Sequence, residues 1–234
     1  MEQDSIRILI RSEKDVAKYR MGWEARAWNS YNQPMRIPCI LLAAGASRRL
    51  GEPKQLIRFQ GETLLERNIR LALEAGCARV MVVLGGHAGQ ILSEVGARLA
   101  RNSEVEIHLH PGWEQGMASS LHAGVRRCQQ LGWTSGVMLM VCDQPYLTAA
   151  HLRSLLEAFA NYAGGRTIAS QYGGILGVPV IFPQSEMGRL LELTGDQGAR
   201  RLLQTIADPV SIVCDGGEFD VDEPEDRMRL QAEL

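Results

Sequence analysis

Short apolar runs alternate with amphipathic segments from residue 37 to the carboxyl end of the chain. Continuous apolar runs at 40–42, 80–84, 137–141 and 178–182 are typical of strands that are covered on both faces of a sheet. The segment 105–109 alternates Val, Ile and Leu with polar residues, which predicts a strand with one more exposed face. The pattern therefore predicts a strand at each of these places.

Amphipathic segments that predict helices lie between and after these strands. They are expected at 63–75, from about 118 or 119 onward, at 148–162, at 198–207 and at 224–234. Gly76 stands where the first helix should stop, because glycine adopts the left-handed conformation that often ends a helix. Thr148 precedes another helix, where its hydroxyl can accept a hydrogen bond from a free backbone N–H. This alternation is typical of an α/β fold with a mostly parallel, doubly wound sheet and helices on both faces.

The first 35 residues do not continue this alternation. They carry a weak strand pattern at 5–11, then mixed charges and the turn-prone Asn32-Gln33-Pro34, without clear periodicity. We expect residues 1–35 to be a poorly ordered extension and residues 36–234 to form the functional domain.

Composition and charge narrow the functional class. Of the 234 residues, 45% are hydrophobic and 22% are charged, and the net charge is −2. This balance argues against a broad nucleic-acid-binding surface, which is usually basic. No apolar run reaches the roughly 18 residues of a membrane helix. The five cysteines contain no CxxC pair, so we expect reduced thiols in a cytoplasmic protein without nucleic-acid or membrane partners.

Ligands of doubly wound sheets bind beyond the carboxyl ends of the strands. The first such place begins with Leu42, Ala43, Ala44 and Gly45, small residues that let the backbone approach a ligand closely. Arg49 and Lys54 follow and would add the positive charge that a triphosphate needs. The same composition also suits a surface loop with solvated cations, and the spacing matches neither a Walker A loop nor GxGxxG.

Carboxylates form a second candidate site. Asp143 follows an apolar strand, and one or two carboxylates together with phosphates suffice for a hard cation such as Mg²⁺. An aspartate that starts a turn would look the same. Asp222 is the second expected metal ligand and Asp220 its alternative, whereas Glu225 and Asp226 fit the negative charge typical of a helix start.

Further polar residues follow other expected strands or begin helices. Ser119 and Ser120 stand at a helix start, where small polar residues either bind phosphate or cap the helix. Arg200 can bind phosphate or carboxylate through two hydrogen bonds, or form a surface ion pair. Gly86 and His87 follow a strand end, close to where a nucleotide base would lie.

Taken in order, several motifs resemble one family. Leu42-Ala43-Ala44-Gly45-x-Ser47-x-Arg49-x-Gly51-x-x-Lys54 resembles the LAAGxSxRMGxxK signature of nucleotidyltransferases related to the molybdenum cofactor guanylyl- and cytidylyltransferases. Similar matches follow at 111–121, at Asp143-Gln144-Pro145, at 195–200 and at 220–226. The LAAG form resembles the cytidylyltransferases, whereas guanylyltransferases carry LAGG. The chain departs from the pattern at Leu50 for Met, His110 for Asn, Val178 for His and Glu223 for Thr.

The resemblance implies a Rossmann-like fold of the nucleotide-diphospho-sugar transferase type. It implies a Mg²⁺-dependent transfer of CMP from CTP, with GTP as the alternative donor, to a phosphate of molybdopterin or molybdenum cofactor, with release of pyrophosphate. Arg49 and Lys54 would then neutralise the triphosphate, Asp143 and Asp222 would hold Mg²⁺, and the loop 42–45 would bind base and ribose. Arg48 would point away from the triphosphate. A molybdoenzyme or its chaperone is the implied protein partner.

Two other functions fit the same residues. The run Pro53-Lys54-Gln55 also occurs in cytidylyltransferases of isoprenoid synthesis, so the acceptor could be a sugar or polyol phosphate. A nucleotide-binding protein that delivers a cofactor without turnover is the third hypothesis. Pyrophosphate release separates it from the two enzymes.

Overall fold

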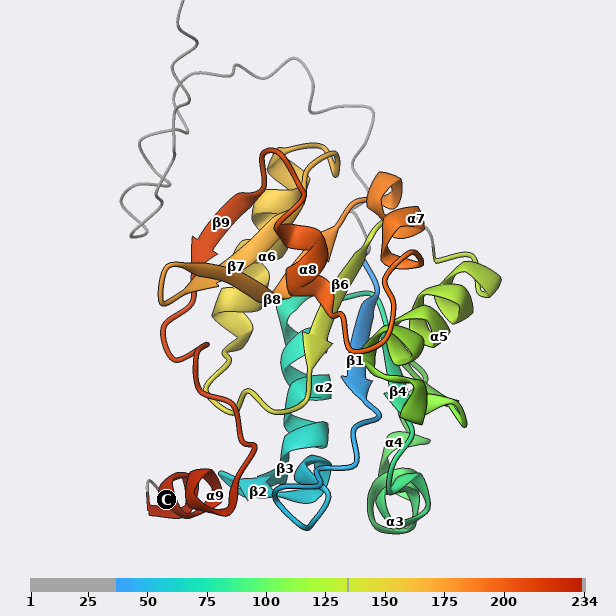
Figure 1. The fold of residues 1–234 in the computed structure, drawn as a ribbon, viewed down its shortest axis with the longest axis vertical. Helices are drawn as coiled ribbons and strands as arrows, with labels where there is room; N and C mark the ends of the chain where they lie inside the picture. Colours follow the sequence, from blue (N-terminus) through green and yellow to red (C-terminus); the bar gives the residue numbers. More distant parts are fainter. Residues whose placement is uncertain (1–36, 134, 233–234) are drawn as a thin grey trace, which may run out of the picture.

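The centre of the molecule is a seven-stranded sheet in the order β5-β4-β1-β6-β8-β7-β9 (Figure 1). The computed structural model describes residues 37–133 and 135–232, so the expected extension 1–35 lies outside the described residues. The strands are β1 (Cys39–Ala43), β4 (Val80–Leu84), β5 (Val105–Leu109), β6 (Val137–Val141), β7 (Ile168–Tyr172), β8 (Ile175–Phe182) and β9 (Val210–Val213). Only β8 runs antiparallel to its neighbours in this sheet of the described chain. The mostly parallel α/β sheet expected from the sequence is confirmed.

The central strands bury both faces, as their continuous apolar runs predicted. On β1, Leu41 packs into a core with α2 (Leu64–Ala75) and α6 (Ala149–Asn161). Its neighbour Ile40 points to the opposite core, because successive side chains of a strand alternate between faces. That second core contains side chains of α5 (Met117–Gln130), α7 (Met187–Leu190) and α8 (Ala199–Leu203). The sheet is therefore covered by helices on both sides.

Helix ends follow the expected signals. The Thr63 hydroxyl accepts a hydrogen bond from the Glu66 N–H at 3.2 Å, and α2 ends before Gly76, whose φ is 113°. Thr148 caps α6 in the same way, through the His151 N–H at 3.1 Å. The helix expected at 198–207 is shorter than predicted, since α8 ends at Leu203. The final helix α9 spans Pro224–Ala232, and residues 233–234 lie outside the described part.

Several elements were not predicted from the sequence pattern. They are β7, β9, α7, the short antiparallel pair β2 (Arg58–Phe59) and β3 (Glu62–Thr63), α3 (Ala88–Ile91), a π-helical turn at Leu92–Gly96, and α4 (Ala97–Leu99). All five cysteines are buried and unpaired, in agreement with reduced thiols. Among the described residues, no helix is long and apolar enough to cross a membrane.

Two segments from distant parts of the chain meet where β1 and β6 end. Figure 1 shows β2, β3 and α9 at this lower edge of the sheet. An ion pair between Arg227 and Glu52 connects α9 to the loop that follows β1. The Val221 N–H donates a hydrogen bond to the Asp143 carbonyl at 2.9 Å, so the chain before α9 runs beside the end of β6. This edge is where the expected ligand-binding residues collect.

Candidate active site

The loop after β1 is a compact turn. Ser47 has a φ of 48°, in the left-handed region, and its carbonyl accepts hydrogen bonds from the N–H groups of Leu50 and Gly51. Its hydroxyl accepts a hydrogen bond from the Lys54 N–H at 3.1 Å. The single residue Ser47 therefore closes the loop and returns Lys54 to the end of β1.

Gln55 holds this loop in place through hydrogen bonds to its backbone. Its side chain is fully buried, and its amide nitrogen donates to the carbonyls of Ala43 at 2.7 Å and Gly45 at 3.1 Å. The two carbonyls lie at the point where β1 becomes the loop. Gln55 thus connects the short 3₁₀ turn Lys54–Leu56 to the strand end that carries the small residues.

A chain of ion pairs crosses the edge of the sheet. The Lys54 ammonium contacts Asp143 and also Asp222, the latter at 3.0 Å. Asp222 in turn pairs with Arg49 at 3.2 Å, and Arg49 reaches Glu223 at 3.4 Å. Lys54 lies 89 positions from Asp143 and 168 from Asp222 in the sequence. The fold therefore brings the three residues Lys54, Asp143 and Asp222 into direct contact.

The position of Asp222 is fixed by the start of α9. One carboxylate oxygen of Asp226 accepts hydrogen bonds from the N–H groups of Asp222 at 3.1 Å and Glu223 at 3.0 Å. This is the reciprocal half of a capping box, in which a residue of the first turn satisfies the backbone before the helix. Asp226 has the capping role that its sequence position predicted.

The charges in this cluster shift the pKa values of Lys54 and Asp220. Burial would lower the pKa of Lys54, but the carboxylates of Asp143 and Asp222 outweigh burial and raise it, so Lys54 is a permanent cation. Asp220 is exposed as a residue, yet burial of its carboxyl together with the charges of Asp143 and Asp222 raises its pKa to about 7. Arg200 on α8 opposes this shift through its positive charge.

Two pockets with shared lining residues lie next to the cluster of Lys54, Asp143 and Asp222. The first has a volume of about 250 Å³ and is lined by Gly45, Ala46, Ser47, Arg48, Arg49, Lys54, Trp113 and Asp222. The second, of about 400 Å³, adds Leu42, Ala44, Glu114, Gly116, Met117, Ser120, Val141, Asp143 and Asp196. Most of the sequence-predicted loop, lysine and carboxylates thus line one continuous region.

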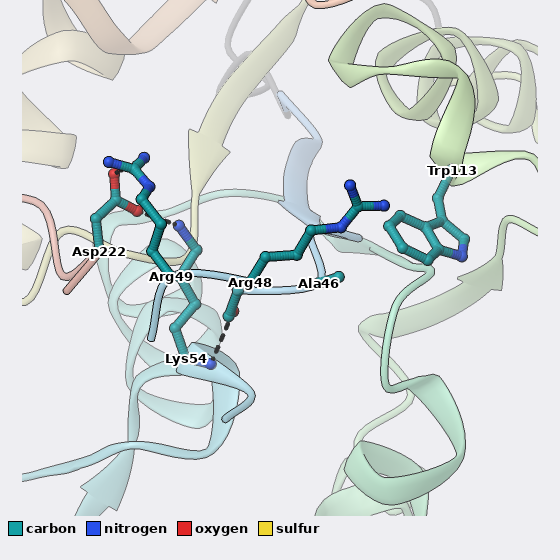
Figure 2. Close-up of a pocket in the computed structure, with 8 residues that line it drawn as sticks. Ala46, Arg48, Arg49, Lys54, Trp113 and Asp222 are labelled. Carbon is teal, nitrogen blue, oxygen red and sulfur yellow. Dashed lines mark hydrogen bonds and ion pairs between the residues drawn. The ribbon is translucent and has the colours of Figure 1, made fainter. Parts of the chain in front are cut away.

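Arg48 and Arg49 diverge although they are neighbours in the chain. Figure 2 shows Arg48 extended across the pocket toward Trp113, while Arg49 turns the other way to Asp222. Arg48 lines both pockets. The expectation that it points away from the triphosphate stays a prediction.

The wall opposite the loop is built by close packing at glycines. A Cβ atom on Gly85 would lie 2.5 Å from the Trp113 side chain and 2.9 Å from the Ala44 carbonyl. A Cβ on Gly116, whose φ is 103°, would lie 2.4 Å from the Gly195 carbonyl. These glycines allow Trp113 and Asp196 to reach the pocket, and Gly198 gives room to Met117, whose Sδ would lie 2.5 Å from a Cβ there. The motif resemblance included Trp113 and Met117 without a role in the site, whereas Asp196 belonged with Ser119, Ser120 and Arg200 to a candidate phosphate site or surface ion pair.

The remaining predicted residues support the loops or lie at the edge of the site. Gly86 donates its N–H to the Ala44 carbonyl at 2.8 Å, and the His87 ring lies 2.9 Å from the Ala46 carbonyl. The Ser119 hydroxyl contacts the His110 ring at 3.0 Å and the Gly116 carbonyl at 2.8 Å. Ala43 faces the core, and Arg200 is exposed on α8.

The carboxylates have the donor chemistry that a hard cation requires. The buried oxygen Oδ1 of Asp143 has no hydrogen-bond partner among the described residues, and Asp143 and Asp222 converge on one cationic nitrogen. Within residues 37–133 and 135–232, no three His, Cys, Asp or Glu side chains group to hold a metal alone. A cation at this place would need further oxygen ligands, as a nucleotide's phosphates would supply.

Comparison with known proteins defines the class. Residues 39–210 match the model of the MobA-like NTP transferase domain, and the chain belongs to this family of nucleotidyltransferases. The match covers β1 to β8, the loop after β1 and the opposite wall at Trp113, whereas Asp222 lies beyond it.

Individual relatives cover most of the chain. The purine catabolism protein PucB of Bacillus subtilis is 32% identical over 82% of this chain and 96% of its own length. A nicotine blue oxidoreductase of Paenarthrobacter nicotinovorans is 28% identical over 83% and 97%. The molybdenum cofactor cytidylyltransferase of Escherichia coli is 29% identical over 81% and 93%. The structure of Rv0371c from Mycobacterium tuberculosis in complex with manganese superimposes with a TM-score of 0.65, at 27% identity, over 85% of this chain and 100% of that one.

Proposed function

We propose that this nucleotidyltransferase moves CMP from CTP to a phosphate group of molybdopterin or molybdenum cofactor. The single observation that carries the chemistry is the contact of Lys54 with Asp143 and Asp222 beneath a pocket lined by Gly45, Arg48 and Arg49. A triphosphate placed there would meet cations on one side and carboxylates suited to a divalent ion on the other.

In the proposed reaction an oxygen of the acceptor phosphate forms a bond to the α-phosphorus of CTP. The bond from the α-phosphorus to the bridging oxygen breaks, and pyrophosphate leaves with the electron pair. Lys54 and Arg49 stabilise the charge of the triphosphate, and the backbone of the loop 42–45 holds the nucleoside part. Most of the catalytic effect then comes from positioning and fixed charge, as is usual for phosphoryl chemistry.

A divalent cation fits this site, and we propose Mg²⁺. Asp143 and Asp222 would hold it, because one buried Asp143 oxygen has no partner among the residues that the structure describes and both carboxylates already face a common cation. The manganese complex of the similar mycobacterial protein supports a divalent ion. When bound, the ion would neutralise charge on the phosphates and the leaving pyrophosphate.

The choice of CTP and of the acceptor rests on the LAAG sequence and on the similar cytidylyltransferase. We further propose that this protein is cytoplasmic and passes its product to a molybdoenzyme or to that enzyme's chaperone. GTP and a sugar or polyol phosphate are the alternative substrates that the assay must include.

The test measures pyrophosphate release by the full chain with ATP, GTP, CTP or UTP, each with and without molybdopterin or a sugar phosphate. We expect turnover with CTP and molybdopterin. Asp143→Asn should lower kcat at least 10²-fold, roughly the effect of losing one preorganised electrostatic group. The matched control is Asp208→Asn, since Asp208 pairs with Arg166 near β9. Turnover with another pair of substrates, or a near-normal rate for Asp143→Asn, would contradict the proposal.

A further inference from the structure

Lys54 stands out among the basic residues of the chain. The 25 basic residues contain three lysines, Lys14, Lys18 and Lys54, and the others are arginines. Lys54 is therefore the one lysine within the part of the chain that the structure describes. An ammonium is a compact point charge with three donors, whereas a guanidinium is a wide planar fork. At position 54 the chain carries the cation whose shape is closest to that of a metal ion.

The surroundings of the Lys54 ammonium are those of a bound cation. Its side chain is only 17% exposed, as is that of Asp143. The ammonium contacts an oxygen of Asp143 and lies 3.0 Å from Oδ1 of Asp222. The other oxygen of Asp222 is engaged by Arg49 at 3.2 Å. Both oxygens of Asp222 are thus engaged, whereas Oδ1 of Asp143 has no partner among the described residues. A divalent ion that used both carboxylates would therefore compete with Lys54 for Asp222 and would lie beside the positive charge of Lys54 at Asp143.

We propose that Lys54 is a built-in substitute for the divalent ion. Its ammonium occupies the place between Asp143 and Asp222 until the ion binds, and the side chain then turns into the pocket. The inference rests on the proposed function, because it assumes a divalent ion between these two carboxylates.

The geometry allows Lys54 to make this change without moving the main chain. Its N–H donates to the Ser47 hydroxyl, and its carbonyl accepts from the Ile57 N–H at 3.2 Å, so the backbone is anchored on both sides. The side chain lines both pockets, so rotation about its own torsions brings the ammonium to the space above the loop. Once its carboxylates are taken, the ammonium is free to pair with an anion there.

Two consequences follow from this exchange. The carboxylates are never left uncompensated in a partly buried site, where unpaired charges are costly. Binding of the ion in the absence of nucleotide is weakened, because the ion must displace Lys54 from Asp222 and is repelled by the ammonium beside Asp143. Lys54 becomes available to phosphate oxygens only after the ion is in place.

The first test measures Mn²⁺ binding by calorimetry in the absence of nucleotide. We expect Lys54→Met to bind Mn²⁺ at least tenfold more tightly than the wild type, which corresponds to about 1.4 kcal/mol. The control is Arg48→Met, which removes a positive charge from the same loop and pocket but breaks no ion pair with Asp143 or Asp222. Unchanged or weaker binding by Lys54→Met overturns the proposal, and so does an equal gain in Arg48→Met. Melting curves confirm that each variant is folded.

The second test uses the wild-type chain and needs no substitution. Acetylation by a sulfo-N-hydroxysuccinimide ester is followed by peptide mass spectrometry, with Lys14 and Lys18 as internal references. A partly buried, ion-paired amine reacts slowly, so we expect saturating Mn²⁺ to raise the relative labelling rate of Lys54 at least fivefold. A rate that does not rise overturns the proposal.

Both tests are independent of the proposed reaction. A chain that transfers another nucleotide, or uses another acceptor, would still show tighter Mn²⁺ binding by Lys54→Met and faster labelling of Lys54. Loss of those two effects in an enzyme that transfers CMP normally would refute the exchange and leave the proposed function intact.

Discussion

Replacing Gln55 by methionine tests whether Gln55 positions the loop after β1 for catalysis or only stabilises the fold. Methionine has nearly the same length and shape as glutamine but cannot donate a hydrogen bond. In Gln55→Met the carbonyls of Ala43 and Gly45 would lose the amide that lies 2.7 Å and 3.1 Å from them. The bond to Ala43 is buried, so water has no direct path to replace the donor there, whereas Gly45 is exposed.

The structure sets the size of the expected effect. Leaving a buried acceptor unsatisfied costs about 1–3 kcal/mol. Part of this is recovered, because the buried Gln55 Oε1 also lacks a partner among the described residues and disappears in the variant. A net loss of about 2 kcal/mol predicts a Tm lowered by roughly 4–8 °C for a chain of this size. Since Gly45 lines both pockets, a shift of about 1 Å in the loop should lower kcat/KM by up to about 10²-fold.

The assay combines thermal melting with steady-state pyrophosphate release at varied CTP, measured where the variant is fully folded. The control is Gln130→Met at the exposed end of α5, which should change neither value. A lower Tm with kcat/KM within threefold of the wild type would show that Gln55 stabilises the fold without positioning the loop. Unchanged values of both would refute the argument entirely.

Two further predictions concern stability. Thr63→Ala removes the cap of α2 and should cost about 1–2 kcal/mol in thermal unfolding, whereas Thr63→Ser, which keeps the hydroxyl, should cost much less. Burial lowers the pKa of His151 to about 4, and its ring lies 2.8 Å from the Ser170 hydroxyl. Since the unfolded pKa is about 6.5, the unfolded chain binds the extra proton first, and stability should fall from pH 6.5 toward pH 4, by about 2 kcal/mol at pH 5. Urea unfolding at pH 7 and pH 5 should show a smaller decrease for His151→Gln, and an equal decrease would assign the loss to other groups.

The sequence predicted the central strands because they are buried on both faces, which requires continuous apolar runs such as 80–84 and 137–141. It did not predict β7, in which Ser170 is fully buried within the strand. That hydroxyl donates to the Pro179 carbonyl at 2.6 Å and contacts His151, and both partners come from other elements. Edge strand β9 has only four residues, one of them 45% exposed, and gave too weak a pattern. Tertiary contacts, not local preference, determine both strands.

In the candidate site, too, the sequence predicts some positions, whereas tertiary contacts determine others. Asp143 could be placed near the loop after β1 from the strand order alone, because parallel strands end at one edge of the sheet. Nothing in spacing or periodicity brings Asp222 to that edge of the sheet. Its contact with Lys54 depends on the hydrogen bond from Val221 to the Asp143 carbonyl and on the Asp226 cap. Likewise, the direction of Arg48 depends on the left-handed turn at Ser47, which the sequence did not reveal.

That turn changes which cation should meet the nucleotide first. Lys54 and Arg49 are already paired with carboxylates, so binding a phosphate requires each to exchange one partner for another. Arg48 extends into both pockets and forms no ion pair within the described residues, so it can bind an anion without breaking an existing contact. Because a hydrogen bond to a charged group contributes about 1.5–3 kcal/mol, Arg48→Ala should raise KM for the nucleotide about tenfold or more and change kcat little. Arg126→Ala, at an exposed position on α5, serves as the control in the same kinetic assay. If Arg48→Ala and Arg126→Ala give the same KM, then Arg48 is solvated in the complex, and the nucleotide relies on the paired cations alone.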